Sequence, residues 1–407
     1  SSTSVNSIVA AQAALSRISV VAANTVAAST SSSTVSVSAA QIRPVAHKTE
    51  TPNDPGFSSQ EHFTSIGMEA AWELTAGSPS VVVAVVDSGM DMTHSDLTNR
   101  WVNQGETSCD DGIDNDNNGF VDDCYGYNFA DNTGNLLLEG DGDHGTHCAG
   151  IVGANSDNQN GVAGTAGGKD GAPGVSLMTL TTFGKNSVGG FAEAIVYGAD
   201  NGASISSNSW GYTSAGVYGQ DELDAIDYFN SNANGGSISD GGIVVFAAGN
   251  DASSGDWYPG VYPGAYAVAA VDDSHSPASF TNFGDWIDVS APGVAIYSTV
   301  FERSGGYASY SGTSMACPMV SGALALLVSY RPGFTRAEYM SCLESTASDV
   351  SSTSPSDYGA GVISPAAALE CIGQLEGSPK PPPAPTSPPL PPSSPPAPPG
   401  FTIVSGA

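Results

Sequence analysis

Three short segments, far apart in the chain, each carry a residue type that nucleophilic hydrolysis needs. They are Val83–Asp87, which ends in an aspartate, His144–Gly150, which begins with a histidine, and Gly312–Ala316, which contains Ser314. A serine hydroxyl is a poor nucleophile unless a base removes its proton during attack. His144 would be that base, and Asp87 would hold its imidazole in the required tautomer and stabilise its charged form. Along this chain the three residues follow the order Asp, His, Ser. Two other common arrangements of the same three residue types begin with His or with Ser.

The three segments and their order resemble those of the subtilisin-like serine proteases, the subtilases. The resemblance extends over roughly residues 55–375. It implies a three-layer αβα sandwich around a mainly parallel sheet, and a serine endopeptidase that forms an acyl-enzyme on Ser314. Ala247-Ala248-Gly249-Asn250 matches the family's oxyanion-hole segment, so the resemblance assigns the side-chain amide of Asn250 to that hole.

The resemblance also suggests where a substrate would bind. Subtilases bind a peptide as an added strand between two chain segments. Ser209-Trp210-Gly211 resembles one wall of the cleft and of the S1 pocket, and Ser187-Val188-Gly189 resembles the opposing strand. Trp257 lies where a small residue at the base of S1 is common in the family, and this departure leaves the P1 preference open.

Alternating apolar and helical patterns predict the elements that carry these residues. Buried strands are expected at Val81–Val86 and Gly242–Ala248, and helices at Ala192–Ala199 and Glu222–Asn230. Such alternation predicts a parallel sheet covered on both faces. In such sheets, sites form beyond the carboxyl ends of strands, where Asp87 and Asn250 both fall.

The segment Met315–Tyr330 reads as a buried helix, with Ser314 just before it and Pro318 in its first turn. A serine at a helix start has its backbone N–H and a favourable dipole available for a developing oxyanion. His147, three residues after His144, lacks the His-Glu-x-x-His pattern of a zinc protease, and we interpret it as a structural histidine.

An acidic loop at residues 110–123 predicts a calcium site. Asp114, Asp116 and Asn118, followed by Gly119, reproduce the first half of an EF-hand loop. The twelfth position is Tyr125 instead of glutamate, so the loop is not an EF-hand. The ligands that would complete the shell are Asp122, Asp123 and the carbonyl of Phe120. The alternative is a solvated acidic turn.

A second calcium site is suggested by Asp96. Its position matches a calcium ligand of the subtilases, and Asn158 and Asn160 from a later loop are its suggested companions. Asparagine-rich loops more often only form turns, so the asparagine pair is the looser part of the match.

Six cysteines fall in two settings. Cys109 with Cys124 and Cys342 with Cys371 form the simplest pairing as two local disulfides, although 15 connectivities are available to six cysteines. Cys148 and Cys317 lie close in sequence to His144 and Ser314, and we expect both to be small buried hydrophobic residues. Paired cysteines favour an oxidising compartment, and we expect a secreted protein, extracellular or in the cell wall.

Composition excludes some partners. With 41 acidic residues against 10 Lys and Arg, the net charge of −31 disfavours binding to nucleic acid. No apolar run approaches the ~20 residues that a membrane span requires. The resemblance to the subtilases implies polypeptide substrates, and we expect a monomer.

The chain divides into four parts by composition. Residues 1–50 are rich in Ser, Ala and Val and read as a linker or the tail of an inhibitory propeptide; 51–376 form the catalytic domain. Residues 377–400 are a proline-rich linker, expected to be polyproline II, and 401–407 read as the start of a further module.

Three alternatives are weighed against the protease. A peptide-binding pseudoprotease would keep the fold, but the three triad residues and Asn250 are present. A structural wall glycoprotein would depend on the proline tract, which covers little of the chain. An esterase would need a Gly-x-Ser-x-Gly elbow and the order Ser, Asp, His. The Gly312-Thr313-Ser314 context contradicts the first requirement, and the observed order Asp, His, Ser contradicts the second.

Overall fold

The computed structural model describes residues 51–136, 142–184, 187–233 and 235–376, and the backbone of residues 401–403. The predictions made for residues 1–50, 377–400 and 404–407 lie outside these ranges. Within them, the four elements predicted from apolar patterns all occur, with ends that differ from the prediction by at most two residues.

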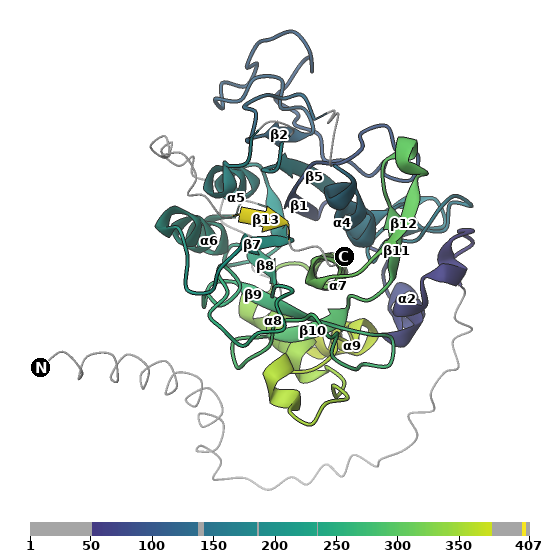
Figure 1. The fold of residues 1–407 in the computed structure, drawn as a ribbon. Helices are drawn as coiled ribbons and strands as arrows, with labels where there is room; N and C mark the ends of the chain where they lie inside the picture. Colours follow the sequence, from purple (N-terminus) through teal and green to yellow (C-terminus); the bar gives the residue numbers. More distant parts are fainter. Residues whose placement is uncertain (1–50, 137–141, 185–186, 234, 377–400, 404–407) are drawn as a thin grey trace, which may run out of the picture. The chain divides into compact units, whose positions relative to one another are not determined.

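A seven-stranded sheet forms the centre of the domain, in the order β10-β9-β8-β6-β1-β5-β2 (Figure 1). Each neighbouring pair in it is parallel, so the prediction of a mainly parallel sheet is confirmed. The strands are β1 (Val82–Asp87), β2 (Gly126–Asn128), β5 (Ser176–Thr181), β6 (Ala203–Asn208), β8 (Ile243–Ala247), β9 (Tyr266–Val271) and β10 (Val289–Pro292).

Helices cover both faces of this sheet. The α-helices are α2 (Glu61–Ser65), α3 (Met68–Trp72), α4 (Asp143–Gly153), α5 (Phe191–Asp200), α6 (Gln220–Asn232), α7 (Thr313–Tyr330), α8 (Arg336–Ser345) and α9 (Pro365–Gln374). Three short 3₁₀ helices lie at η1 (Phe57–Ser59), η2 (Glu302–Ser304) and η3 (Pro355–Tyr358).

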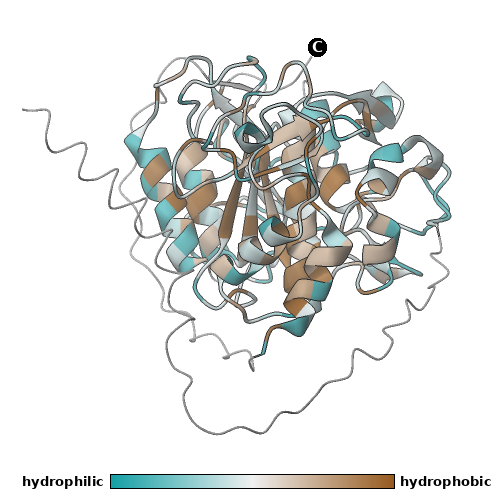
Figure 2. Cartoon of the chain, turned by 90° about the horizontal axis from the view of Figure 1, so that it is seen from below, coloured by the Kyte–Doolittle hydropathy of each residue, from teal (hydrophilic) through white to brown (hydrophobic). Residues whose placement is uncertain are grey.

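Strand β1 shows why its sequence is a continuous apolar run. Val83 and Val85 point into the core that contains α4 and α7, whereas Val82, Ala84 and Val86 point into a second core with α5 and α6. Successive side chains of a strand face opposite sides, so a strand between two helical layers must be apolar on both. Figure 2 shows hydrophobic colour on the central strands and hydrophilic colour on outer parts of the helices.

Helix α7 runs through the larger core, and its residues from Thr313 to Val328 are buried. The helix begins two residues earlier than predicted, so Ser314 is its second residue and Pro318 lies inside it rather than in its first turn. Among the described helices, α7 alone is long and apolar enough to cross a membrane, but 89% of it is buried inside the protein, as in the core helix of a globular domain.

Smaller elements complete the domain. They are the antiparallel pairs β11 (Ile296–Thr299) with β12 (Tyr307–Tyr310), β3 (Gly168–Lys169) with β4 (Ala172–Pro173), and β7 (Trp210–Tyr212) with β13 (Phe401–Ile403). Both expected disulfides, Cys109–Cys124 and Cys342–Cys371, are present, and Cys148 and Cys317 are free and buried as expected.

Candidate active site

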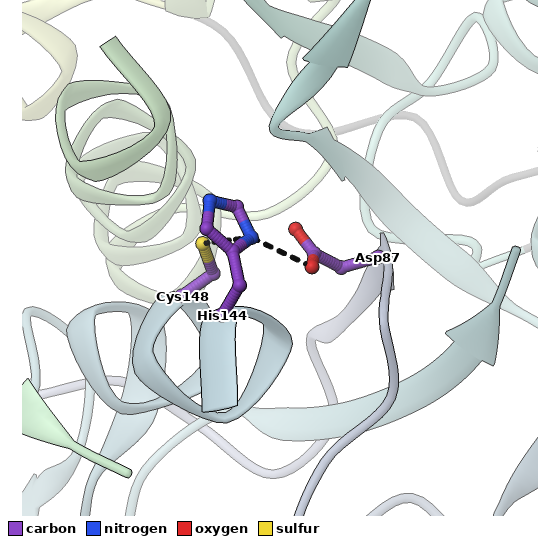
Figure 3. A group of neighbouring side chains, drawn as sticks. All are labelled: Asp87, His144 and Cys148. Atoms are coloured by element: carbon purple, nitrogen blue, oxygen red, sulfur yellow. Dashed lines mark hydrogen bonds and ion pairs between the residues drawn. The ribbon is translucent and has the colours of Figure 1, made fainter. Parts of the chain in front are cut away.

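Asp87 and His144 form a buried pair at the carboxyl end of β1. Asp87 ends the strand and His144 is the second residue of α4. His144 Nδ1 lies 2.8 Å from Asp87 Oδ1, and Figure 3 shows this pair. The backbone N–H of Ser88 also donates to this oxygen. A carboxylate accepts only, so it holds the proton on Nδ1 and leaves Nε2 to act as a base. Among the described residues, Nε2 is buried without a hydrogen-bond partner.

Cys148 links this pair to the start of α7. It lies one helical turn after His144, and its Sγ is 3.9 Å from His144 Nδ1 (Figure 3). The same thiol donates to the carbonyl of Ser314 over 3.4 Å. Burial raises the pKa of the Cys148 thiol well above its usual value, so this side chain stays protonated. It therefore packs against the site as a neutral group and is not a second nucleophile.

Pro318 leaves the Ser314 carbonyl available to accept hydrogen bonds from outside the helix. In a helix, the carbonyl of residue 314 would accept from the N–H of residue 318, but proline has no N–H. Ser209 Oγ donates to the Ser314 carbonyl over 2.9 Å, alongside Cys148. In the opposite direction, Ser314 Oγ donates to the carbonyl of Ser209 over 3.3 Å. The serine is thus anchored to the chain just before β7.

Asn250 lies beside the same helix start. It follows β8, and its side-chain oxygen accepts from both the backbone N–H and the hydroxyl of Thr313, each at 3.0 Å. These two donors identify which end of the amide faces Thr313. The amide nitrogen is then the end that can serve a substrate oxygen next to Ser314.

His147 has the features of a structural histidine. Its side chain is fully buried, stacks on Tyr310 with 4.5 Å between ring centroids, and donates from Nε2 toward the carbonyls of Ile296 and Ala308. Burial lowers its pKa to about 3, so the ring is neutral.

The two predicted substrate segments differ in secondary structure: Ser187–Gly189 lies outside the named strands, whereas Trp210 and Gly211 belong to β7. Val188 forms an antiparallel bridge with Phe183 and its side chain is 49% exposed, while Ser187 Oγ donates to Asp131 over 2.7 Å. Gly189 donates its N–H to the carbonyl of Thr182. This segment therefore has an ordered backbone with an outward side chain at its centre.

In Ser209-Trp210-Gly211, the structure adds a detail that the resemblance did not give. The Trp210 ring is fully buried and packs against Phe191 and Phe246, with centroids 4.3 and 5.0 Å away. Its side chain is therefore a core residue, and this segment can meet a peptide only through its backbone. The indole nitrogen of Trp257 is buried and has no partner among the described residues.

The acidic loop brings only some of its carboxylates together. Asp116 and Asp123 lie with Glu106 in a group whose nearest oxygens are all within 4.8 Å, and Asn118 donates to Asp116 and Asp123. Glu106 was not predicted, because it lies outside the spacing pattern that marks the loop. Its Oε2 is buried and lacks a partner within the described residues.

The other predicted ligands of this loop have different surroundings. Asp114 accepts from the N–H groups of Asn118 and Gly119, and Asp122 accepts from those of Asp111 and Gly112. The Phe120 ring packs in an aromatic cluster with Tyr127, Phe129 and Tyr197. These side chains shape the loop's turns and its attachment to the domain.

Asp96 is fully buried at the second predicted site. Its oxygens accept from the Asn158 amide and the Val162 N–H, each at 2.9 Å. Burial raises its pKa to about 6, and the nearby Asp54 carboxylate contributes to this rise. Asp54 was not predicted; it is buried too, and accepts from the N–H of Asn158.

Asn160 lies at the edge of this second site. Its amide donates to Ser95 and its N–H donates to the Asn158 side chain. Next to it, Gly161 adopts φ +45°, and a side chain there would collide with Asp96 and the Tyr307 hydroxyl. The backbone is thus packed closely around the buried carboxylate.

A sequence model of the subtilase family matches residues 78–361. This chain belongs to the subtilase family. Thermitase of Thermoactinomyces vulgaris is 35% identical over 308 residues, which cover 74% of this subtilase and 94% of thermitase. Subtilisin NAT of Bacillus subtilis subsp. natto is 33% identical over 298 residues, 72% of this subtilase and 66% of that relative.

A solved structure of a protease from Pseudoalteromonas arctica PAMC 21717 has the same fold. It matches 79% of this subtilase and 100% of that chain, with a TM-score of 0.61 and 28% identity. The predictions of family, three-layer α/β fold and serine endopeptidase class are thus confirmed. This subtilase spans 65% of the thermophilic serine proteinase of Bacillus sp. (strain AK1) and 54% of the halolysin of Haloferax mediterranei, so those relatives contain additional sequence.

Proposed function

We propose that this subtilase is a secreted endopeptidase in which Ser314 is the nucleophile, His144 the general acid and base, and Asp87 the residue that orients His144. The observation that carries the proposal is the buried 2.8 Å pair of Asp87 and His144, tied through Cys148 to the carbonyl of Ser314. The pair and the serine come from different elements, and this contact brings them to one place.

The proposed reaction depends on proton transfers between Ser314, His144 and the substrate. Ser314 Oγ attacks the carbonyl carbon of the scissile peptide while His144 Nε2 takes the hydroxyl proton. Asp87 stabilises the imidazolium through Nδ1–H. His144 then returns the proton to the leaving amine nitrogen, the peptide C–N bond breaks, and an acyl-enzyme remains on Ser314. A water molecule releases the acid by the same steps, with His144 again acting as base.

The oxyanion that forms during attack needs two donors. We assign them to the backbone N–H of Ser314 and the amide nitrogen of Asn250. Ser314 is the second residue of α7, so its N–H lies at the positive end of the helix dipole. Asn250 is held against the preceding residue, Thr313, by two hydrogen bonds.

We propose that polypeptide substrates bind as a strand between Ser187–Gly189 and Ser209–Gly211. The burial of Trp210 supports backbone pairing as the main contact, since its side chain belongs to the core. Antiparallel pairing uses N–H and C=O groups that every peptide has. It therefore fixes the direction in which the substrate binds, but it selects little for the substrate's sequence.

We propose two calcium sites with a structural role. The first would be held by Asp116, Asp123 and Glu106, with Asn118 beside them, and by Asp114, Asp122 and the Phe120 carbonyl as further oxygen ligands. Oxygen donors of this kind suit Ca²⁺. The buried Oε2 of Glu106 has no hydrogen-bond partner among the described residues, which fits a role as a cation ligand. The second would use Asp96 and Asp54, two buried carboxylates that repel each other when both are ionised.

Secretion and domain organisation belong to the same proposal. The names of relatives from Natrialba magadii and Xanthomonas campestris describe extracellular proteases. Two disulfides suit an oxidising compartment. We propose a monomeric catalytic domain over 51–376, an inhibitory propeptide tail within 1–50, and a proline-rich linker over 377–400.

A serine-directed fluorophosphonate tests the catalytic assignment. Intact mass should show one adduct, on Ser314, and none in a Ser314→Ala variant with the same circular dichroism spectrum. An adduct that persists in the Ser314→Ala protein would assign the nucleophile elsewhere. A folded, calcium-loaded protein that takes no label would indicate a pseudoprotease.

A further inference from the structure

The chain's own residues 401–403 pair with one edge of the substrate cleft. Strand β13 lies antiparallel to β7, with Phe401 opposite Tyr212, Thr402 opposite Gly211 and Ile403 opposite Trp210 (Figure 1). Trp210 and Gly211 belong to the segment that the proposed function assigns to substrate backbone pairing. Strand β7 is not part of the seven-stranded sheet, and within the described ranges β13 is its strand partner.

The direction of this pairing matters for catalysis. As residue numbers rise from 401 to 403, the partners fall from Tyr212 to Trp210, so β13 runs toward Ser209. The carbonyl of Ser209 accepts from the nucleophile Ser314 Oγ over 3.3 Å. A substrate must present its acyl part to the serine with the carboxyl end pointing at it, and β13 has this direction.

We propose that residues 401–403 form an intramolecular inhibitory strand, which occupies the acyl side of the cleft and competes with substrate. This inference rests on the proposed function. Strand β13 lies where the acyl half of a cleaved peptide substrate would remain bound. Its pairing with β7 therefore blocks the cleft, even if the enzyme cleaves the peptide bond that follows β13.

The tether makes such competition effective even if the strand alone binds weakly. Residues 377–400 join the catalytic domain to β13, so pairing of β13 with β7 is intramolecular, at an effective concentration set by the length and stiffness of this proline-rich segment. Such pairing does not depend on protein concentration, unlike the binding of an added peptide. An added peptide must displace the strand before it can pair with Gly211.

A proline substitution in the strand tests the proposal. Thr402→Pro removes an N–H and restricts the backbone opposite Gly211, and Thr386→Pro makes the same exchange within the linker as a matched control. With a peptide substrate, we expect Thr402→Pro to lower KM about tenfold with kcat unchanged, as follows if the strand fills the cleft about nine-tenths of the time. A synthetic peptide of residues 398–404 should inhibit Thr402→Pro competitively. Equal KM values in all three proteins would overturn the proposal.

A second readout does not depend on activity. In a Ser314→Ala background, which prevents self-cleavage, the amides of Trp210–Tyr212 should exchange hydrogen faster in Thr402→Pro than in Thr386→Pro. Equal exchange in the two proteins would also overturn the proposal. Failure of every active-serine protein to react with the fluorophosphonate would refute the proposed function instead, while the exchange comparison would still decide whether β13 occupies β7.

Discussion

At the residue scale, each group that we propose to be catalytic is held by a partner from another part of the chain. Asp87 fixes His144, Ser209 anchors Ser314, and Thr313 orients the amide of Asn250. These contacts set geometry before a substrate arrives, which is how a site avoids the cost of reorganising during reaction. Pro318 contributes by lacking an N–H, since the Ser314 carbonyl is then available to Ser209.

The carboxylate of Asp87 should be needed for its effect on the tautomer of His144. An Asp87→Asn variant would present an amide that can donate to Nδ1, which favours the proton on Nε2 and removes the base. We expect kcat to fall about 10⁴-fold, the loss known for this exchange in a chymotrypsin-type triad, with KM little changed. The measurement is steady-state kinetics normalised by folded protein, with the exposed Asp285→Asn as control. A loss below tenfold would show that Asp87 does not control the tautomer.

At the element scale, β7 and α6 share a buried acid. Glu222 in the first turn of α6 is 3% exposed, and its Oε2 accepts from the Tyr212 hydroxyl of β7 at 3.4 Å. Burial raises the pKa of Glu222 to about 7, and the neighbouring Asp221 adds to the rise. Ionising this side chain is therefore harder in the folded protein than in the unfolded one.

This raised pKa predicts a loss of stability as pH increases. Below the unfolded pKa of Glu222, near 4.5, the acid is neutral in both states and costs nothing. Between about 4.5 and 7 the unfolded state ionises first, so the free energy of unfolding falls, by on the order of 3 kcal/mol at pH 8. Glu222→Gln should remove this component, which denaturant unfolding at pH 4.5, 6 and 8 would measure.

The control is Glu193→Gln in α5, at a half-buried position that also loses one acidic side chain. This variant is not expected to change the slope of stability against pH in the same window. A Glu222→Gln protein whose stability falls with pH as steeply as the wild type between 4.5 and 7 would contradict the assignment. The comparison is between slopes, so a small change in overall stability from the amide does not affect it.

At the scale of the whole molecule, charge sets the conditions for stability. A net charge of −31 makes the compact state repel itself, and bound divalent cations reduce that repulsion where carboxylates gather. The group formed by Glu106, Asp116 and Asp123 is such a place. Because Cys109–Cys124 closes the same loop, the disulfide and the cation would act on one segment.

Removing calcium should therefore lower the thermal midpoint. A ligand present at 100 times its Kd stabilises a protein by about 2.7 kcal/mol, and chelation removes that contribution. Calorimetry with calcium and with chelator should show a clear difference for the wild type and a smaller one for Asp116→Asn. Asp285→Asn, exposed and distant in sequence, should keep the full difference. Identical midpoints with and without calcium in the wild type would favour a solvated acidic turn.

The sequence by itself determined the family and the central strands and helices, and it predicted the triad residues. Apolar runs such as Val81–Val86 are local, and their length and flanks distinguish a buried strand without knowledge of its neighbours. Asp87 and Asn250 lie at the carboxyl ends of β1 and β8, as predicted. Parallel strands bring their carboxyl ends to one edge of the sheet.

Only the tertiary structure decided which way particular side chains face and which distant residues meet. The inward turn of Trp210, the addition of Glu106 and Asp54 to the acidic groups, and the pairing of residues 401–403 with β7 all depend on contacts between separate segments. Local sequence patterns do not predict such contacts. Their energy comes from packing and hydrogen bonds that exist only after the chain has closed around its sheet.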